Sequence, residues 1–106
     1  MGHASVPELA QSMKLEWSDE ALADLDRFVE FLNRERPSLA AIVATEIIDK
    51  VQVLSEHPRL GRPIAGRKEY RQIVLQVLGA AYVFQYRFDG HRLVMLRVYH
   101  AREARK

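Results

Sequence analysis

Cysteine is absent from this sequence of 106 residues. Its absence excludes disulfide bonds and metal sites built on thiolates, and it is compatible with a reducing compartment such as the cytoplasm. Long apolar runs are absent as well. No stretch approaches the length of a membrane span, and the N-terminus lacks the apolar core of a signal peptide. We therefore expect a soluble cytoplasmic protein without a membrane partner.

Motifs for the commoner catalytic chemistries are also missing. The histidines show no paired ligand spacing and have no carboxylate cluster beside them, so we expect no metal ion. The chain contains neither a glycine-rich phosphate loop nor an activated-serine motif. The sequence thus predicts a protein that works without a cofactor.

The composition indicates one globular domain with an uneven charge distribution. Hydrophobic residues make up 48% of the chain, enough for one core. The net charge is only +2, from 16 Lys and Arg against 14 Asp and Glu. Most acidic residues lie in the first half, while the second half is basic. In residues 58–71, only Glu69 opposes five basic side chains: Arg59, Arg62, Arg67, Lys68 and Arg71.

The stretch from residue 70 to residue 102 organises the second half of the chain. It contains three runs rich in Val, Ile, Leu, Phe and Tyr, with breaks at residues 78–80 and at Asp89-Gly90. Asp-Gly between alternating apolar runs is the strongest short-range hairpin signal, because the turn needs positive φ. The sequence therefore predicts a three-stranded antiparallel meander.

Alternation along these strands predicts one core face and one working face that carries positive charge. Tyr82, Phe84, Tyr86 and Phe88 share one side of the middle strand, and we expect them in the core, with the tyrosine hydroxyls at its rim. In the last strand, we expect Val94, Leu96 and Val98 on one face and Arg97 and Tyr99 on the other.

The first half of the chain reads as a short strand followed by two helices. Residues 14–17 alternate like an edge strand, which we expect to pair with a late strand. Ser18 is the predicted cap of a helix that ends before Pro37, and Ser38 is the predicted cap of a second helix that ends at His57-Pro58. The apolar stripes are Leu22, Leu25, Phe28, Val29 and Leu32, and then Leu39, Ile42, Val43, Ile47, Val51 and Leu54.

These elements predict an α+β domain of order β-α-α-β-β-β. A short connection makes the two helices an antiparallel hairpin, which we expect to pack on one face of an antiparallel sheet. Residues 58–69, with Gly61, Pro63 and Gly66, are predicted to form a basic loop. Residues 1–12 show no periodicity, and we expect a disordered leader or a remnant of expression there. The predicted single domain is 13–106.

This order and its sequence motifs resemble the RelE/ParE superfamily of bacterial toxins. The resemblance covers residues 13–105 and is carried by WSDEALADLDRFVEFL, EHPRLGRP, YRQIVL, YVFQYRF and LRVYHAR, in that order. It implies the sheet-and-helix-hairpin fold and the toxin role in a type II toxin–antitoxin system. It also implies a hetero-oligomer with a cognate antitoxin, a small acidic protein with a DNA-binding domain.

The superfamily contains two activities: RelE-like members cut mRNA on the ribosome, and ParE-like members inhibit DNA gyrase. The RelE type usually carries an arginine after the first tyrosine of the middle strand, where this chain has Val83 after Tyr82. It also tends to carry a late catalytic tyrosine, whereas here only Glu-Ala-Arg-Lys follows Arg102. The resemblance therefore favours a ParE-like gyrase inhibitor without bond chemistry of its own. A ribosome-dependent endoribonuclease is the alternative.

Candidate functional residues follow from both activities. Cutting RNA without a metal ion requires a base, an acid and cations on the phosphate. If the chain is such an enzyme, the candidates are Arg97, Tyr99, His100 and Arg102, with Arg71 as a further cation. We favour a structural or capping role for His100, because it follows Val98 by two residues. The candidates for binding the target or the antitoxin are Arg59, Arg62, Arg67, Lys68, Arg71, Arg97 and Arg102.

Overall fold

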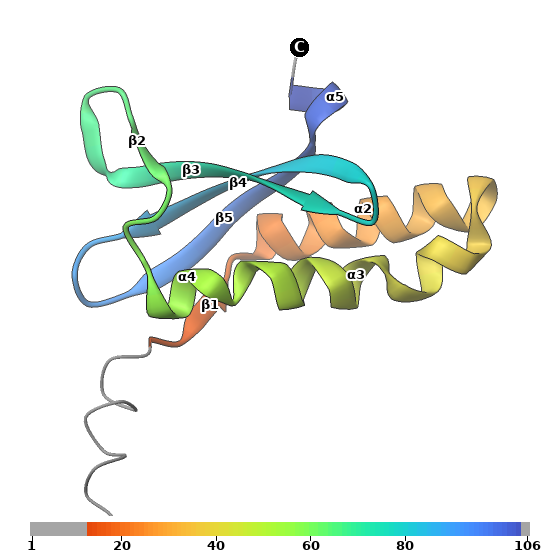
Figure 1. Ribbon diagram of the computed structural model, residues 1–106, viewed down its shortest axis with the longest axis horizontal. Coiled ribbons are helices and arrows are strands. Elements are labelled where there is room, and N and C mark those ends of the chain that lie inside the picture. Colours follow the sequence, from red (N-terminus) through yellow and green to blue (C-terminus); the bar gives the residue numbers. More distant parts are fainter. Residues whose placement is uncertain (1–12, 105–106) are drawn as a thin grey trace, which may run out of the picture.

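The computed structural model describes residues 13–104, with side chains for residues 13–102 (Figure 1). The predicted leader, residues 1–12, and the end of the predicted domain, residues 105–106, lie outside this part. The elements are β1 (Leu15–Trp17), α2 (Asp19–Glu35), α3 (Pro37–Val51), α4 (Val53–Glu56), β2 (Arg62–Ile64), β3 (Arg67–Val77), β4 (Ala80–Phe88), β5 (Leu93–His100) and α5 (Ala101–Ala104). None of these helices is long and apolar enough to cross a membrane.

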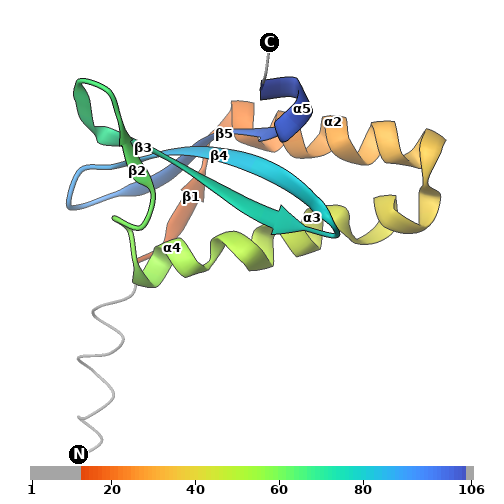
Figure 2. The ribbon, with the colours of Figure 1, turned by 45° about the horizontal axis from the view of Figure 1, so that its top comes forward.

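The predicted α+β fold is confirmed, with a five-stranded sheet of order β1-β5-β4-β3-β2. Strands β3, β4 and β5 form the predicted antiparallel meander. The sheet is mixed rather than wholly antiparallel, because β1 pairs in parallel with β5. The prediction that the first strand pairs with a late strand is confirmed. The predicted loop at 58–69 contains β2, which pairs antiparallel with β3. Helices α2 and α3 form the predicted hairpin and lie side by side below the sheet (Figures 1 and 2).

Local signals explain where the helices begin and end. The Ser18 hydroxyl accepts a hydrogen bond from the Ala21 N–H at 3.0 Å, so the predicted cap of α2 is confirmed. Helix α2 ends at Glu35, before Pro37. The predicted Ser38 cap of the next helix is wrong, because α3 already begins at Pro37 and Arg36 is the capping position. Proline suits the first helical position, where its missing N–H would have no intrahelical partner anyway.

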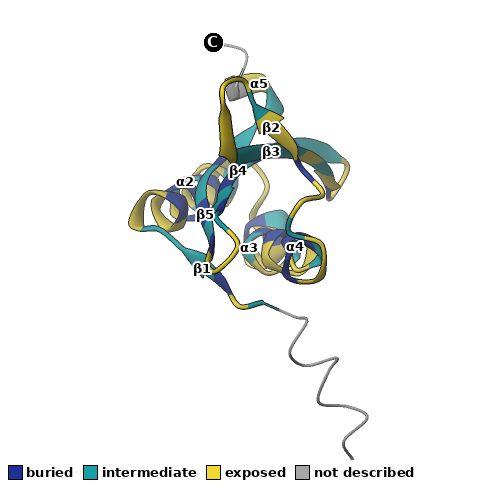
Figure 3. Cartoon of the chain, turned by 90° about the vertical axis from the view of Figure 1, so that its left-hand side faces the viewer, coloured by how far each residue is buried: buried dark blue, intermediate teal, exposed yellow. Residues whose placement is uncertain are grey.

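The core lies between the helix hairpin and the sheet, and the outer sides of both helices are exposed (Figure 3). Two residues of the predicted stripes are outside it: Leu22 is 47% exposed and Ile42 is 43% exposed. Each sits at the margin of its stripe, where helical spacing alone does not decide burial. The buried apolar side chains of the hairpin are Ala21, Leu25, Phe28, Ala40, Val43, Ile47, Val51 and Leu54.

The sheet side of the core confirms the middle strand and corrects the last one. Tyr82, Phe84, Tyr86 and Phe88 are all buried, as predicted. In β5, the buried residues are Leu93, Met95 and Val98, so the predicted face of Val94, Leu96 and Val98 is wrong. The cause is a bulge: Gln85 pairs with Arg97, but Tyr86 pairs with Met95, which leaves Leu96 as the extra residue. One extra residue reverses the alternation from that point on.

Candidate functional site

The C-terminal end of β5 holds the residues that the sequence offered for RNA cleavage. Arg97 is bound to Asp24 of α2, with its Nε at 2.9 Å and its Nη2 at 3.0 Å from the carboxylate oxygens. The same carboxylate accepts hydrogen bonds from the Val98 N–H at 2.7 Å and from Arg27 at 2.7 Å. The charge of Arg97 is therefore compensated inside the protein.

Asp24 is the buried residue at the centre of this network, since it is only 1% exposed. Burial by itself raises the pKa of this carboxyl, but the hydrogen bonds from Arg97, Val98 and Arg27 outweigh it and hold the pKa below the ordinary value. Strand β1 pairs with residues 93–95 of β5. The Asp24 carboxylate binds the backbone N–H of Val98, three residues beyond the end of this pairing. Sequence reasoning missed Asp24. A carboxylate on the apolar side of a helix, three residues after Ala21, was the available signal.

Tyr99 and His100 project from opposite faces of the sheet. Tyr99 pairs with Val83 on the outer face, where the Arg97 guanidinium lies 4.9 Å from the centre of its ring. His100 pairs with Tyr82 on the helix side, and the two rings meet edge to face at 5.3 Å. The His100 Nδ1 accepts a hydrogen bond from the Arg102 N–H at 3.2 Å, at the start of α5. This geometry matches the capping role that we favoured for His100.

The opposite end of the sheet holds a loop that the buried Tyr86 and the half-buried Arg71 keep in place. The Tyr86 hydroxyl donates to the Pro58 carbonyl at 2.7 Å and accepts from the Gly61 N–H at 2.8 Å. Arg71 Nη1 donates to the carbonyls of Gly61 at 2.7 Å and Arg59 at 3.1 Å. The Tyr86 hydroxyl is thus paired in the interior. The sequence-based prediction that it lies at the rim of the core is wrong for this residue. Burial raises its pKa, while the Gly61 N–H and the Arg71 charge act in the opposite direction.

Gly61 is required by this arrangement. A Cβ at this position would lie 2.8 Å from the Tyr86 ring and 2.9 Å from the Gln72 carbonyl oxygen, which is closer than such atoms approach. The glycine of the EHPRLGRP segment therefore allows the loop to lie directly on β3 and β4. With Tyr86 and Arg71, it makes residues 58–61 a closely held structure.

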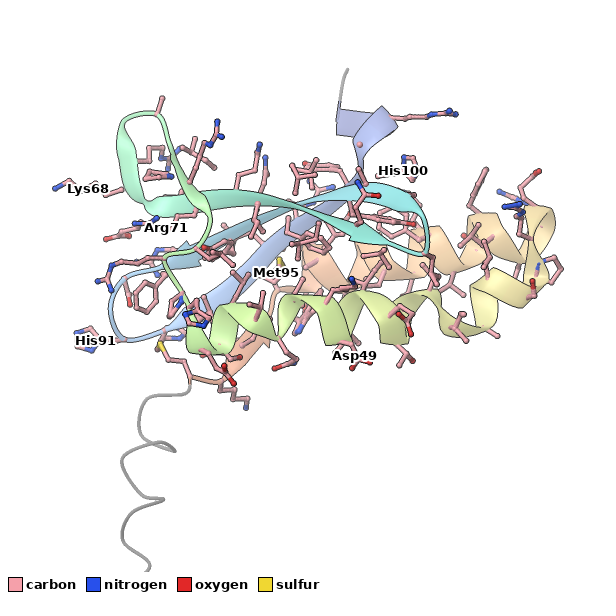
Figure 4. All side chains as sticks on the ribbon, viewed as in Figure 1. Asp49, Lys68, Arg71, His91, Met95 and His100 are labelled. Carbon is pink, nitrogen blue, oxygen red and sulfur yellow. The ribbon has the colours of Figure 1, made fainter. Side chains whose placement is uncertain are left out.

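The remaining basic candidates lie around this loop and the β2–β3 hairpin. Arg59 is exposed, with its guanidinium 5.0 Å from the centre of the Phe88 ring. Arg67 lies over Tyr70 at 4.4 Å, and Arg62 and Lys68 are exposed. Figure 4 shows Lys68 and Arg71 near this hairpin and His100 beside α5. Because Arg71 pairs with Tyr86 and His100 with Tyr82, they are separated by four residues along β4, roughly 13 Å.

The outer face of the sheet is less charged than predicted. Its centre holds neutral side chains, including Val74 and the hydrogen-bonded pair Gln72 and Gln85. Arg87 forms ion pairs with Glu69 at 2.9 Å and with Asp89 at 3.3 Å. Alternation correctly predicted that the sheet has a second face. It does not show that Arg87 pairs with Glu69 and Asp89, or that Arg97 pairs with Asp24 of α2.

A groove that the sequence did not predict lies between the far end of the helix hairpin and the β3–β4 turn. Its volume is about 830 Å³. Phe31 of α2 is 53% exposed and Leu78 of the turn is 39% exposed, and both line it. Leu78 has a φ of 52°, a left-handed conformation that is unfavourable for leucine. The charged side chains that line the groove are Arg27, Glu30, Arg34, Glu35, Arg36 and Arg102.

The fold agrees with the resemblance to the RelE/ParE superfamily of toxins. A family model described as "ParE toxin of type II toxin-antitoxin system, parDE" matches residues 15–105. The chain therefore belongs to the ParE toxin family of type II toxin–antitoxin systems, and this membership implies an antitoxin partner.

Two individual proteins are similar to this chain. "Putative toxin Y4kP" of Sinorhizobium fredii (strain NBRC 101917 / NGR234) is 33% identical over 91 residues, which cover 85% of this chain and 90% of that protein. A solved structure described as "Chromosomal ParDE TA system from P. aeruginosa" superposes with a TM-score of 0.67 at 22% identity. It covers 85% of this chain and 97% of its own. At this identity, the superposition shows the fold alone.

Proposed function

We propose that this protein inhibits DNA gyrase in the cytoplasm by occupying a surface of the enzyme, and that it catalyses no bond cleavage itself. The observation that carries this choice is the divergence of Tyr99 and His100 onto opposite faces of β5. A base and an acid that act on one scissile phosphate must both face the bound RNA, one within hydrogen-bond reach of the 2′-hydroxyl and the other within reach of the 5′-oxygen. The Arg97 charge, which such a reaction would need on the phosphate, is already bound by Asp24.

Val83 supports the same proposal. It is 8% exposed and lies between Val74 and Tyr99 on the neighbouring strands. The resemblance to RelE-like toxins implies an arginine here, but valine neither carries a charge nor donates a hydrogen bond. Loss of one electrostatic contact in a transition state typically costs about 100-fold or more in rate. A nuclease with this residue would lack a main source of phosphate stabilisation.

One preparation of the protein tests this proposal in two assays. We expect the purified protein to block DNA supercoiling by gyrase and to leave ribosome-bound mRNA intact. Cleavage of mRNA on the ribosome with gyrase unaffected would reverse the assignment. It would return Arg97, Tyr99, His100 and Arg102 as catalytic candidates for the endoribonuclease alternative.

The antitoxin partner completes the proposal, and the groove at the far end of the helix hairpin supports it. We propose that a segment of a small acidic antitoxin occupies this groove, because its apolar floor carries exposed Phe31 and Leu78 and its rim carries Arg34, Arg36 and Arg102. Expression of the toxin alone should arrest growth, and co-expression with the neighbouring gene should restore it. Normal growth at a verified soluble level of the toxin alone would refute the toxin assignment.

A further inference from the structure

The loop between α4 and β2 presents a small, closely held surface at the end of the molecule opposite the α2–α3 turn (Figure 1). We refer to Arg59, Leu60 and Arg62 as the tip. The backbone of this loop is bound by Tyr86 and Arg71 and seated through Gly61, as described above. The Leu60 N–H donates to the His57 carbonyl at 3.0 Å, which closes the turn that displays the leucine.

Leu60 is the apolar centre of the tip and is 52% exposed. Arg59 precedes it and Arg62 follows two residues later, and both are exposed. Within residues 13–102, neither guanidinium forms an ion pair with a carboxylate, in contrast to Arg87, Arg92 and Arg97. Among the residues that the structure describes, two positive charges without a carboxylate partner therefore flank an exposed leucine, and Arg59 lies over the Phe88 ring.

We propose that the tip is the contact by which this toxin docks on gyrase, with Leu60 entering an apolar pocket whose rim is acidic. This inference rests on the proposed gyrase inhibition and assigns it to particular residues. Binding energy concentrates in a few well-placed side chains, of which arginine is one of the commonest, around a desolvated apolar centre. A loop that is already ordered loses little conformational freedom when it binds. The buried Tyr86 and the half-buried Arg71 are the positioning residues of this contact.

The shape and composition of the tip favour a folded protein as its partner. A leucine makes no hydrogen bond to phosphate or to a base edge, and single-stranded nucleic acid is bound by aromatic stacking, for which the tip offers no ring. The tip is an exposed surface on a closely held loop, whereas the site that we assign to the antitoxin is a groove. The two surfaces lie at opposite ends of the sheet, so that different side chains serve the two partners.

The test measures inhibition of gyrase supercoiling by four forms of the full-length protein. The wild type is compared with Leu60→Asp, with the double variant Arg59→Glu/Arg62→Glu and with Lys50→Glu, which reverses an exposed charge in the last turn of α3 as a control. We expect at least a tenfold higher concentration for half-inhibition with both tip variants and no change with Lys50→Glu. Melting temperatures of all four forms should agree within a few degrees, because each altered side chain is exposed.

Each other outcome has a defined meaning. Wild-type inhibition that both tip variants retain would overturn the docking assignment and leave gyrase inhibition standing. An equal loss with Lys50→Glu would also overturn it, because net charge and not the tip would then govern binding. Wild-type protein that does not inhibit gyrase would refute the proposed function itself. Binding of free duplex DNA by the wild type that both tip variants lose would assign the tip to nucleic acid and overturn the protein contact.

Discussion

Asp24 is the residue whose removal most directly tests how the helix hairpin is joined to the sheet. Its carboxylate is 2% exposed and binds the Val98 N–H, Arg97 and Arg27. Replacement by alanine leaves the buried Val98 N–H without an acceptor and leaves Arg97 and Arg27 without the carboxylate that binds them. Asp24→Asn keeps the shape and one oxygen for the Val98 N–H but removes the charge.

The magnitude follows from these two losses. Breaking a fully buried ion pair typically costs about 3–5 kcal/mol. The Arg97 side chain is 38% exposed, so that water replaces part of what it loses. An unsatisfied buried N–H costs about 1–3 kcal/mol. We therefore expect Asp24→Ala to lower the free energy of unfolding by about 2–4 kcal/mol, and Asp24→Asn by about 1–2 kcal/mol.

Urea denaturation at several pH values is the assay. The folded-state pKa of Asp24 is depressed, so its contribution is present above the unfolded pKa, about 4, and is lost as pH falls through the folded value. The difference in stability between wild type and Asp24→Asn should therefore be constant from pH 7 to pH 5 and shrink at lower pH. A loss below about 0.5 kcal/mol for Asp24→Ala, within the usual range for surface substitutions, would refute the role of this carboxylate.

Three further substitutions test other parts of the structure. Ile47→Ala, at a fully buried position of α3, should cost about 2–4 kcal/mol in urea denaturation, and an unchanged midpoint would contradict its packing. Tyr86→Phe should cost about 1–3 kcal/mol, because the Gly61 N–H and the Pro58 carbonyl lose their shared hydroxyl; a thermal melt matching the wild type would show that the loop does not need it. Leu78→Asn should raise stability by about 0.5–1 kcal/mol, because asparagine accepts positive φ more readily, and a lower melting temperature would show that the leucine stabilises the turn through its contacts.

Much of the architecture could be predicted from local signals in the sequence. Asp89-Gly90 marks the β4–β5 hairpin. Ser18 is the N-cap of α2, and this helix ends two residues before Pro37. These features depend on the backbone preferences of one or two residues, so they can be recognised from the residue types alone. The alternation of Tyr82 to Phe88 likewise needs only the two-residue period of a strand.

The sequence alone therefore determined the order of β1, the helix hairpin and the meander, the core side of β4 and the resemblance to a toxin family, but not α4, β2 or α5. Only the tertiary structure decided which charges are free and which side chains meet. Arg97 is compensated by a carboxylate 73 residues earlier, and Arg71 is occupied by a loop 10 residues earlier. The bulge at Leu96 places Met95 and Val98, and not Leu96, in the core. Contacts between residues that are distant in sequence leave no periodicity or spacing in the sequence. Because these contacts decide which residues form a site, the site could not be predicted from local patterns.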